Sequence, residues 1–361
     1  MNLQISTTTA DGGRSDDEVR SILSNPGFGT NFTDHMFSAT WTPEQGWHDG
    51  QVVPYAPLSL DPATAVLHYA QEIFEGLKAY RHADGSVWSF RPEANAARMI
   101  RSSQRLALPE LPVEDFVASV DALVRADQRW VPDPQGEKSL YLRPFMFASE
   151  SFLGVRPAKQ VSYLVIASPA GAYFAGGIKP VRLGLSERYT RAGKGGMGAA
   201  KTGGNYASSL AAQQEAMSRG FDQVVFLDDI ENTYVEELGG MNLWFVYDDG
   251  TLVTPELGTI LEGVTRNSII TLARSLGHKV EERRFSIDEW KSGVASGRIT
   301  EVFACGTAAV VTPVGTLTGD DGEADAAPNG PGEVTMRIRQ QLVDTQYGRV
   351  EDVNGWMHKI C

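Results

Sequence analysis

The residues whose types and spacing most suggest chemistry lie in the segment RAGKGGMGAAKTGGNYA, residues 191–207, where a lysine stands among glycines. Three interpretations of this segment compete. Gly193, Gly195 and Gly198 formally satisfy the dinucleotide-binding pattern G-x-G-x-x-G. That pattern should follow a strand directly and open a helix, whereas here ERYTRA separates it from the strand-like VRLGLS. The first interpretation, a dinucleotide site, is therefore weak.

The same segment approaches the P-loop pattern, which requires a glycine directly before its lysine. Ala200 occupies that position before Lys201, so this second interpretation is similarly weak. The third is a lysine that forms a Schiff base, with Gly203 and Gly204 leaving space for a flat ring to approach the backbone. Lysine suits that chemistry because burial or a neighbouring cation readily keeps part of it unprotonated. Local spacing alone nevertheless favours an ordinary exposed loop charge.

The length and composition of the chain are typical of a folded protein with two domains. It has 361 residues, of which 42% are hydrophobic and 21% charged, and a chain of this length normally divides into two cores. There are 45 acidic and 32 basic residues, for a net charge of -13. Such a charge repels nucleic acid and anionic membranes, so we expect neither as a partner.

Residues that bind metals or form disulfides are few. Cys305 and Cys361 are the two cysteines, and they form no CxxC pair. The six histidines show no pair at the spacing of metal ligands on a helix. We therefore predict no metal site and a reducing, cytoplasmic location. No run of 18 apolar residues predicts a membrane span, and the first residues lack the pattern of a signal peptide.

The elements that would position Lys201 fall into four predicted segments. Residues 1–25 are polar and predict a mobile arm, with structure beginning after Pro26. Residues 26–170 predict a small mixed α/β domain, with strand-like VLHYA, SVWSFR, SLYLRPFMFA and VSYLVIAS and helical EANAARMIRSSQRLAL and VEDFVASVDALVRADQRW. Residues 171–181 predict an interdomain loop, and residues 182–361 a larger second domain.

The second domain alternates strand-like and helical runs and contains many hairpin signals, which predicts a barrel-like or mixed sheet. Its helices include NYASSLAAQQEAMSRG, NSIITLARSLG and IDEWKSGVASG. Its predicted strands include QVVFLDD, YVEELGG and EVFACGTAAVVTPV, the last taken as one strand. Residues 319–333 predict an exposed acidic loop.

A resemblance to a known family extends over most of the chain. The segments AAKTGGNYASSLAAQ, YVEELGGMNLWFV, LVTPEL, GVTR and EVFACGTAAVVTPV resemble branched-chain amino acid aminotransferases of fold type IV. FGTNFTDHM, LHYAQEIFEGLKAY, FRPEANAARM, LYLRPF and FLGVRP resemble the same family in the same order. The resemblance implies a two-domain enzyme that uses pyridoxal 5'-phosphate.

The resemblance also implies roles around the cofactor ring. Lys201 would hold the cofactor as a Schiff base and then act as general base and acid. Glu237 would face the pyridine nitrogen and stabilise its protonated form, and Tyr206 would hydrogen-bond the phenolic oxygen. Because strand side chains alternate faces, we expect Glu237 to be buried and its neighbour Glu236 to be exposed.

The cofactor phosphate needs hydrogen-bond donors and positive charge. The segment Gly263–Arg266 precedes a predicted helix, so the resemblance places the phosphate at the free N–H groups near Val264 and Thr265. Thr307 would add a hydroxyl, and Arg98 of the first domain would supply the charge.

The resemblance implies a substrate pocket with an apolar wall and one arginine. Its wall would be Phe28, Phe74 and Tyr141, and Arg143 would pair with the second carboxylate of glutamate. Gly240 and Ala308 would offer N–H groups to the α-carboxylate. The partner subunit of a homodimer would close the pocket with three further residues, Tyr69, Leu153 and Val155.

The implied reaction is reversible ping-pong transfer of an amino group between L-leucine, L-isoleucine or L-valine and 2-oxoglutarate. Two alternatives within the fold are a D-amino acid aminotransferase and an aminodeoxychorismate lyase, which would share Lys201 and Glu237 but lack LYLRP and FLGVRP. A remote alternative is a nucleotide-binding enzyme that uses the glycine-rich loop. Some relatives carry a CxxC pair where this chain has Ala309 and Thr312, so we expect Cys305 to be a small core residue.

Overall fold

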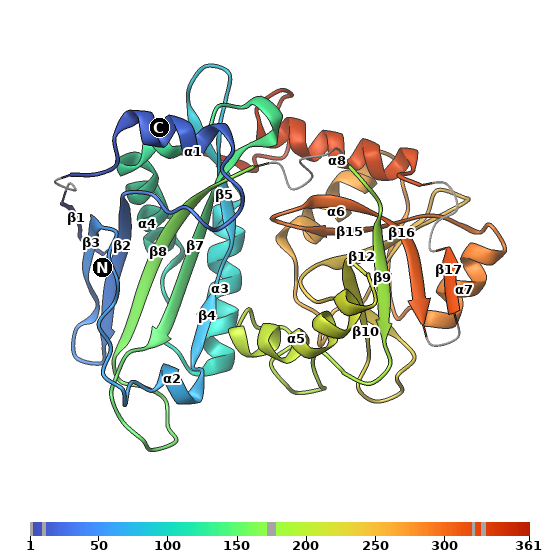
Figure 1. The fold of residues 1–361 in the computed structure, drawn as a ribbon, viewed down its shortest axis with the longest axis horizontal. Coiled ribbons are helices and arrows are strands. Elements are labelled where there is room, and N and C mark those ends of the chain that lie inside the picture. Colours follow the sequence, from blue (N-terminus) through green and yellow to red (C-terminus); the bar gives the residue numbers. More distant parts are fainter. Residues whose placement is uncertain (1–2, 9–11, 172–177, 320–321, 326–329) are drawn as a thin grey trace. The chain divides into compact units, whose positions relative to one another are not determined.

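The strands predicted by apolar patterns are arranged in two β-sheets. Each sheet has nine strands in the part of the chain that the structure describes. The computed structural model describes residues 3–8, 12–171, 178–319, 322–325 and 330–361. The chain divides into two compact units, drawn in Figure 1. The first comprises Met1–Tyr173, Ala200–Gly203 and Asp344–Cys361, and the second comprises Phe174–Ala199 and Gly204–Val343.

The first unit contains a mainly antiparallel sheet and two long helices. Its strands follow the order β1-β3-β2-β8-β7-β5-β6-β18, with β4 paired to β7, and β1 is parallel to β3. Its elements are β1 (Ile5–Thr7), α1 (Asp16–Ser24), β2 (His35–Thr42), β3 (Gly46–Pro54), α2 (Val66–Tyr69), β4 (Glu72–Phe74), β5 (Leu77–Arg81), β6 (Val87–Phe90), α3 (Pro92–Leu106), α4 (Val113–Ala126), β7 (Ser139–Ala148), β8 (Val161–Ala170) and β18 (Met357–Lys359).

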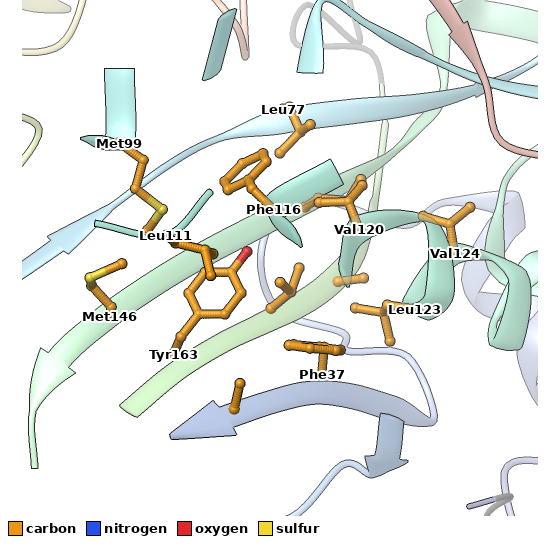
Figure 2. Packing of buried hydrophobic residues seen from close by; sticks show 14 of the residues in the cluster. Phe37, Leu77, Met99, Leu111, Phe116, Val120, Leu123, Val124, Met146 and Tyr163 are labelled. Carbon is orange, nitrogen blue, oxygen red and sulfur yellow. The ribbon is translucent and has the colours of Figure 1, made fainter. Parts of the chain in front are cut away.

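The core of the first unit lies between this sheet and helices α3 and α4. Phe116 of α4 and Phe37 of β2 are fully buried, and both rings pack against Tyr163 of β8. Figure 2 shows this cluster, with α4 side chains directed toward the strands. The three- and four-residue spacing of apolar residues in α4 is what directs one stripe of the helix into the core. Both predicted helices and the predicted strands SVWSFR, SLYLRPFMFA and VSYLVIAS are confirmed.

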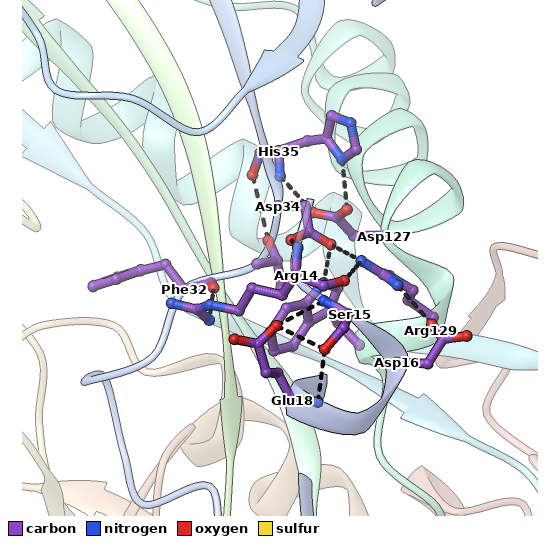
Figure 3. A network of polar contacts seen from close by, with 11 residues as sticks. Arg14, Ser15, Asp16, Glu18, Phe32, Asp34, His35, Asp127 and Arg129 are labelled. Carbon is purple, nitrogen blue, oxygen red and sulfur yellow. Dashed lines mark hydrogen bonds and ion pairs between the residues drawn. The ribbon is translucent and has the colours of Figure 1, made fainter. Parts of the chain in front are cut away.

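Regular structure begins before Pro26, so the expectation that residues 1–25 lack it is wrong. Strand β1 pairs with β3, and α1 begins with a capping box in which Ser15 and Glu18 bond each other. Figure 3 shows how Arg129 fastens this segment through Asp16 and Asp34, each at 2.7 Å. In residues 12–25 the polar composition therefore reflects a helix cap and ion pairs, while residues 1–2 and 9–11 lie outside the described residues.

The second unit contains a barrel-like sheet, as predicted. The strand order β11-β10-β9-β16-β15-β12 closes on itself because β12 also pairs with β11. Its elements are β9 (Val181–Ser186), α5 (Gly203–Ser218), β10 (Gln223–Leu227), β11 (Val235–Leu238), β12 (Asn242–Tyr247), β13 (Leu252–Pro255), α6 (Val264–Ser275), β14 (Val280–Arg283), α7 (Ile287–Ala295), β15 (Ile299–Gly306), β16 (Val310–Gly319), β17 (Gly322–Asp325) and α8 (Glu333–Gln346).

Two predictions of local structure are wrong, and one helix was missed. VLHYA is the short helix α2 rather than a strand, and it ends where Ala70 adopts a left-handed conformation. EVFACGTAAVVTPV is not one strand but the hairpin of β15 and β16, which turns at residues 307–309. Helix α8 was not predicted at all. Short apolar runs do not distinguish a strand from a helix or reveal a turn without strong turn residues.

The division of the chain also differs from the predicted one. Residues 344–361 join the first unit because β18 pairs with β6 and Ile360 is buried in that core. Residues 200–203 join it as well. With these additions the first unit contains more residues than the second, contrary to the predicted order of sizes. Residues 172–177 of the predicted loop 171–181 and residues 320–321 and 326–329 of the predicted acidic loop 319–333 lie outside the described residues. Within the second segment the loop prediction is wrong for residues 322–325, which form β17 against β16.

None of the described helices is both long enough and apolar enough to cross a membrane.

Candidate active site

Lys201 is fastened to the first unit on both sides of its backbone. Its N–H donates to the Ser102 hydroxyl of α3 at 2.9 Å, and its carbonyl accepts the Phe74 N–H of β4, also at 2.9 Å. Its Nζ lies 4.6 Å from the centroid of the Phe74 ring. The half-buried lysine is thus held at a fixed place rather than on an exposed loop.

Glu72 fastens the two residues that follow Lys201. The Thr202 hydroxyl donates to the Glu72 carbonyl at 2.7 Å, and the Gly203 N–H donates to the Glu72 carboxylate. A side chain at Gly203 would collide with that carboxylate, which explains this glycine of the loop. Burial raises the pKa of Glu72, although the Gly203 N–H, the Thr202 hydroxyl and the charge of Arg143 act in the opposite direction.

Arg98, the predicted phosphate ligand, lies in α3 and forms a buried ion pair with Glu75. Its Nε and Nη2 each donate to one Glu75 oxygen at 2.8 Å. Asn95, one turn earlier, adds a third bond to the same carboxylate, also at 2.8 Å. Burial works to raise the pKa of Glu75, but Arg98, Lys201 and Asn95 together hold it below its ordinary value. Glu75 therefore carries a negative charge at neutral pH.

The structure brings together the predicted pocket residues of the first unit. The Phe28 and Tyr141 rings are 5.1 Å apart. The Arg143 guanidinium lies 4.8 Å from the Phe74 ring centroid and 5.4 Å from that of Tyr141, and its Nη2 donates to the Tyr141 hydroxyl at 3.0 Å. Its buried Nε has no hydrogen-bond partner among the described residues. An arginine with spare donor capacity thus lies among three aromatic rings.

Tyr69, Leu153 and Val155, predicted to reach a partner subunit, lie on the surface of the first unit. Tyr69 donates its hydroxyl to the Leu153 carbonyl at 2.6 Å. The side chains of Leu153 and Val155 are 74% and 88% exposed.

Glu237, the predicted partner of the ring nitrogen, lies in β11 of the second unit and is 3% exposed. Arg191 of the glycine-rich segment pairs with it, Nη2 to Oε1, at 2.8 Å. The Leu261 N–H donates to the same oxygen at 2.8 Å, and the Asn242 amide approaches the other at 3.3 Å. Gly198 lies where a side chain would strike the Thr259 carbonyl, so close backbone packing explains this second glycine.

The expectation that Glu236 is exposed is wrong. Glu236 is only 5% exposed, and it accepts a hydrogen bond from the Thr259 hydroxyl. Both faces of β11 are covered, because the segment that contains Thr259 and Leu261 donates to both carboxylates. Burial raises the pKa of Glu236 to about 7. Its Oε2 has no hydrogen-bond partner among the described residues, and the residue lines an open, acidic cavity of about 650 Å³.

The remaining predicted residues of the second unit lie at helix starts and turns. Tyr206 is in α5, and a side chain at Gly240 would contact its ring at 3.7 Å. Val264 and Thr265 are the first two residues of α6, whose N-cap, Gly263, makes no side-chain hydrogen bond. The half-buried residues Thr307 and Ala308 form the turn between β15 and β16.

Four residues at these places were missed at the level of sequence. They are Glu72, Glu75, Ser102 and Arg191. Glu72 and Glu75 stand within the quoted segment LHYAQEIFEGLKAY, so two acids in an apolar run were the available signal. Ser102 and Arg191 carry no such signal.

Cys305 is fully buried, and burial raises the pKa of its thiol to about 12, which suits the predicted core role. Across the described ranges, no group of three or more His, Cys, Asp or Glu residues is arranged to hold a metal ion.

Known proteins resemble this chain in sequence over nearly its whole length. The amino-transferase class IV family matches residues 72–317. A probable branched-chain-amino-acid aminotransferase of Streptomyces coelicolor is 61% identical over 348 residues, which cover 96% of each chain.

Solved structures resemble it as well. The branched-chain amino acid aminotransferase of Escherichia coli has a TM-score of 0.76 and 28% identity, covering 91% of this chain and 99% of its own. The T.th. branched-chain amino acid aminotransferase, solved with N-(5'-phosphopyridoxyl)-L-glutamate, has a TM-score of 0.73 and 30% identity, covering 90% of this chain and 98% of its own. These matches confirm the predicted fold type. The chain belongs to the class IV aminotransferases and, within them, to the branched-chain-amino-acid aminotransferases.

Proposed function

We propose that this chain transfers amino groups reversibly between leucine, isoleucine or valine and 2-oxoglutarate, with pyridoxal 5'-phosphate as cofactor. The observation that carries the proposal is Lys201, fixed by two backbone hydrogen bonds beside an aromatic cluster that contains one arginine. The complex of the T.th. relative with a phosphopyridoxyl glutamate supports both the cofactor and the second substrate.

The residues present fit this cofactor. Glu237 offers a buried carboxylate suited to a protonated ring nitrogen, and the first turn of α6 offers N–H groups that no N-cap side chain occupies. We assign the phosphate to this turn, at Val264 and Thr265, with Thr307 and Arg98 as further ligands. Tyr206 would bond the phenolic oxygen. When bound, the cofactor withdraws electrons from the Cα–H bond of the substrate.

Lys201 would move a proton at the substrate Cα. Proton transfer requires Nζ to occupy the same position in each catalytic cycle. A lysine side chain has four rotatable bonds, so Nζ can otherwise reach many positions. Anchoring the backbone at Ser102 and Phe74 limits the volume that Nζ can reach. The Phe74 ring beneath Nζ excludes water on that side.

The aromatic cluster of the first unit would select the side chain of the substrate. Phe28, Phe74 and Tyr141 supply apolar surface for a branched side chain. Arg143 has a donor left for the second carboxylate of glutamate. A branched aliphatic substrate would then pack against the three aromatic rings. A dicarboxylate substrate would pack against the same rings and pair its second carboxylate with Arg143. Gly240 and Ala308 would bind the α-carboxylate through backbone N–H groups.

A second copy of the chain would complete the pocket. The exposure of Leu153 and Val155 supports this assignment, as does the bond that ties Tyr69 to the same loop. We place the homodimer in the cytoplasm, which suits two unpaired cysteines.

Replacing Lys201 tests the proposal. Lys201→Ala should fold normally and lose at least about 10³-fold in the rate of leucine:2-oxoglutarate transamination, because the proton carrier is gone. Lys194→Ala is the matched control, since this exposed lysine lies in the same glycine-rich segment, and it should keep full activity. Borohydride should reduce the coloured holoenzyme and mark the Lys201 peptide. Substantial turnover by Lys201→Ala would refute the assignment, and preference for D-amino acids in a donor panel would refute the substrate class.

A further inference from the structure

We propose that Glu72 is a positioning residue for Lys201, which fixes the segment Lys201–Gly203 and thereby the reach of the lysine amine. The inference rests on the proposed function and deepens it, since it concerns a residue to which neither the family nor the resemblance gave a role.

The segment Lys201–Gly203 is held by three residues, of which Glu72 holds the last two positions. Phe74 and Ser102 hold the two backbone groups of Lys201 itself. Glu72 then holds the hydroxyl of Thr202 with its carbonyl and the N–H of Gly203 with its carboxylate. Thr202 is fully buried, so its hydroxyl needs this partner. Three consecutive residues are therefore pinned to β4 and α3, and Glu72 supplies half of the attachment.

A carboxylate suits this place because α5 begins at Gly203. The first N–H groups of a helix have no partner within the helix, and the positive end of its dipole favours an anion. Glu72 thus does from a neighbouring strand what an N-cap side chain does from within the chain. Its cost is partial burial, which raises the pKa of Glu72 and which the Gly203 N–H, the Thr202 hydroxyl and the charge of Arg143 offset only in part.

Gly203 and Glu72 are complementary in shape. A Cβ at Gly203 would lie too close to the carboxylate, so the Glu72 side chain would have to shift and give up its bond to the Gly203 N–H. This provides a test that is specific to the contact. Gly203→Ala should be more damaging when Glu72 is present than when Glu72 is replaced by alanine.

The consequence of releasing the segment is a lysine that is present but misplaced. Errors of about 1 Å in the position of a reacting group cost up to about 10²-fold in rate. Because Glu72 is assigned no contact with substrate, its loss should lower kcat and leave KM for leucine nearly unchanged. Loss of a residue that only stabilises the fold would lower neither.

The experiment compares four variants of the holoenzyme. Glu72→Ala should lower kcat about 10- to 100-fold with KM for leucine changed less than about 3-fold. Glu72→Gln keeps an oxygen acceptor for the Gly203 N–H and should recover most of that loss. Gly203→Ala should lose more than Glu72→Ala, and the double variant should be at least as active as Gly203→Ala alone.

Gln71→Ala is the matched structural control. Gln71 precedes Glu72 and bonds the carbonyls of Leu106 and Ala107 rather than the lysine segment, so this change should lower stability and leave kcat unchanged. If Glu72→Ala does not fold, the kcat and cofactor spectra of Glu72→Gln and of Gly203→Ala, each measured alone and combined, carry the test.

Two results would overturn the inference. One is a wild-type kcat in Glu72→Ala, and the other is an equal loss from Gly203→Ala with and without Glu72. Both leave the proposed function standing as long as Lys201→Ala is inactive. Activity in Lys201→Ala, by contrast, removes the proposed function itself.

Discussion

Each unit contains a buried carboxylate paired with a buried arginine, and the two pairs are built differently. In the first unit Glu75 and Arg98 meet through two bonds of 2.8 Å, with side chains 0% and 5% exposed. In the second unit Arg191 meets Glu237 through one contact of 2.8 Å, with side chains 4% and 3% exposed. The two pairs are buried to a similar extent, but the first is held by two hydrogen bonds between its side chains and the second by one.

The difference lies in what surrounds each pair. Asn95 and Arg98 stand one turn apart on α3, so a single helix face serves Glu75. Glu237 is held by two loop residues, Arg191 and Leu261, and by Asn242 of β12. Near it, Arg191 Nε and Glu236 Oε2 lack hydrogen-bond partners among the described residues. The first pair is satisfied within its unit. The second leaves polar capacity and an extra acid, which suits a place where a protonated cofactor ring is expected.

The largest expected effect comes from breaking the two pairs in parallel. Arg98→Met should lower the free energy of unfolding by about 3–5 kcal/mol, since Glu75 is left buried without its cation. Arg191→Met should cost less, about 1–3 kcal/mol, since Glu237 loses one contact and keeps the backbone donor of Leu261. The Gly198 and Thr259 carbonyls also lose the donor that Arg191 supplies, and this loss is part of that figure. Urea unfolding of cofactor-free protein measures both. Equal losses would show that the bidentate geometry of the first pair is of no consequence.

A smaller effect should follow from the extra acid of the second pair. The pKa of Glu236 is raised from 4.5 to about 7, so the folded protein keeps a proton that the unfolded chain releases. Stability is therefore lost as the pH rises from about 4.5 to about 7. Glu236→Gln should be more stable than the wild type at pH 8 by about 1–2 kcal/mol, allowing for solvent screening.

The same variant at low pH supplies its own control. At about pH 4.5 neither the unfolded nor the folded chain gains much from ionising Glu236, so the two proteins should unfold at nearly the same urea concentration. A stability difference that does not change with pH would show that burial of Glu236, rather than its charge, is responsible.

The smallest effect concerns the amides that assist each pair. Asn95 bonds Glu75 at 2.8 Å, whereas Asn242 approaches Glu237 at 3.3 Å. Because a short bond to a charged group contributes more, Asn95→Ala should destabilise the protein by about 1 kcal/mol more than Asn242→Ala. Thermal unfolding of the two variants at one pH makes the comparison. The reverse order would mean that the second pair is the more tightly held.

The two pairs also show what sequence can and cannot predict. The apolar spacing of the sequence predicted helix α3, and a family motif predicted the role of Arg98. The ion pair of Arg98 with Glu75 was not predicted, because a single sequence does not show which acidic residue lies near an arginine in the fold. Alternation along β11 predicted opposite environments for Glu236 and Glu237. That rule assumes one open face, and the segment around Thr259 covers it. The barrel was predictable because many short hairpin signals accumulate along the chain, whereas α2 and the β15–β16 turn depend on single residues.

The packing of residues 344–361 against the first unit has a consequence for folding during synthesis. Strand β18 completes one edge of the first sheet, and the Ile360 N–H and Cys361 carbonyl both bond Val87. Ribosomes deliver the chain from its amino end, at about 5–20 residues per second. The second unit is therefore synthesised entirely before the first can close its sheet, so the early strand β6 must remain without its neighbour β18 for as long as the intervening residues take to emerge.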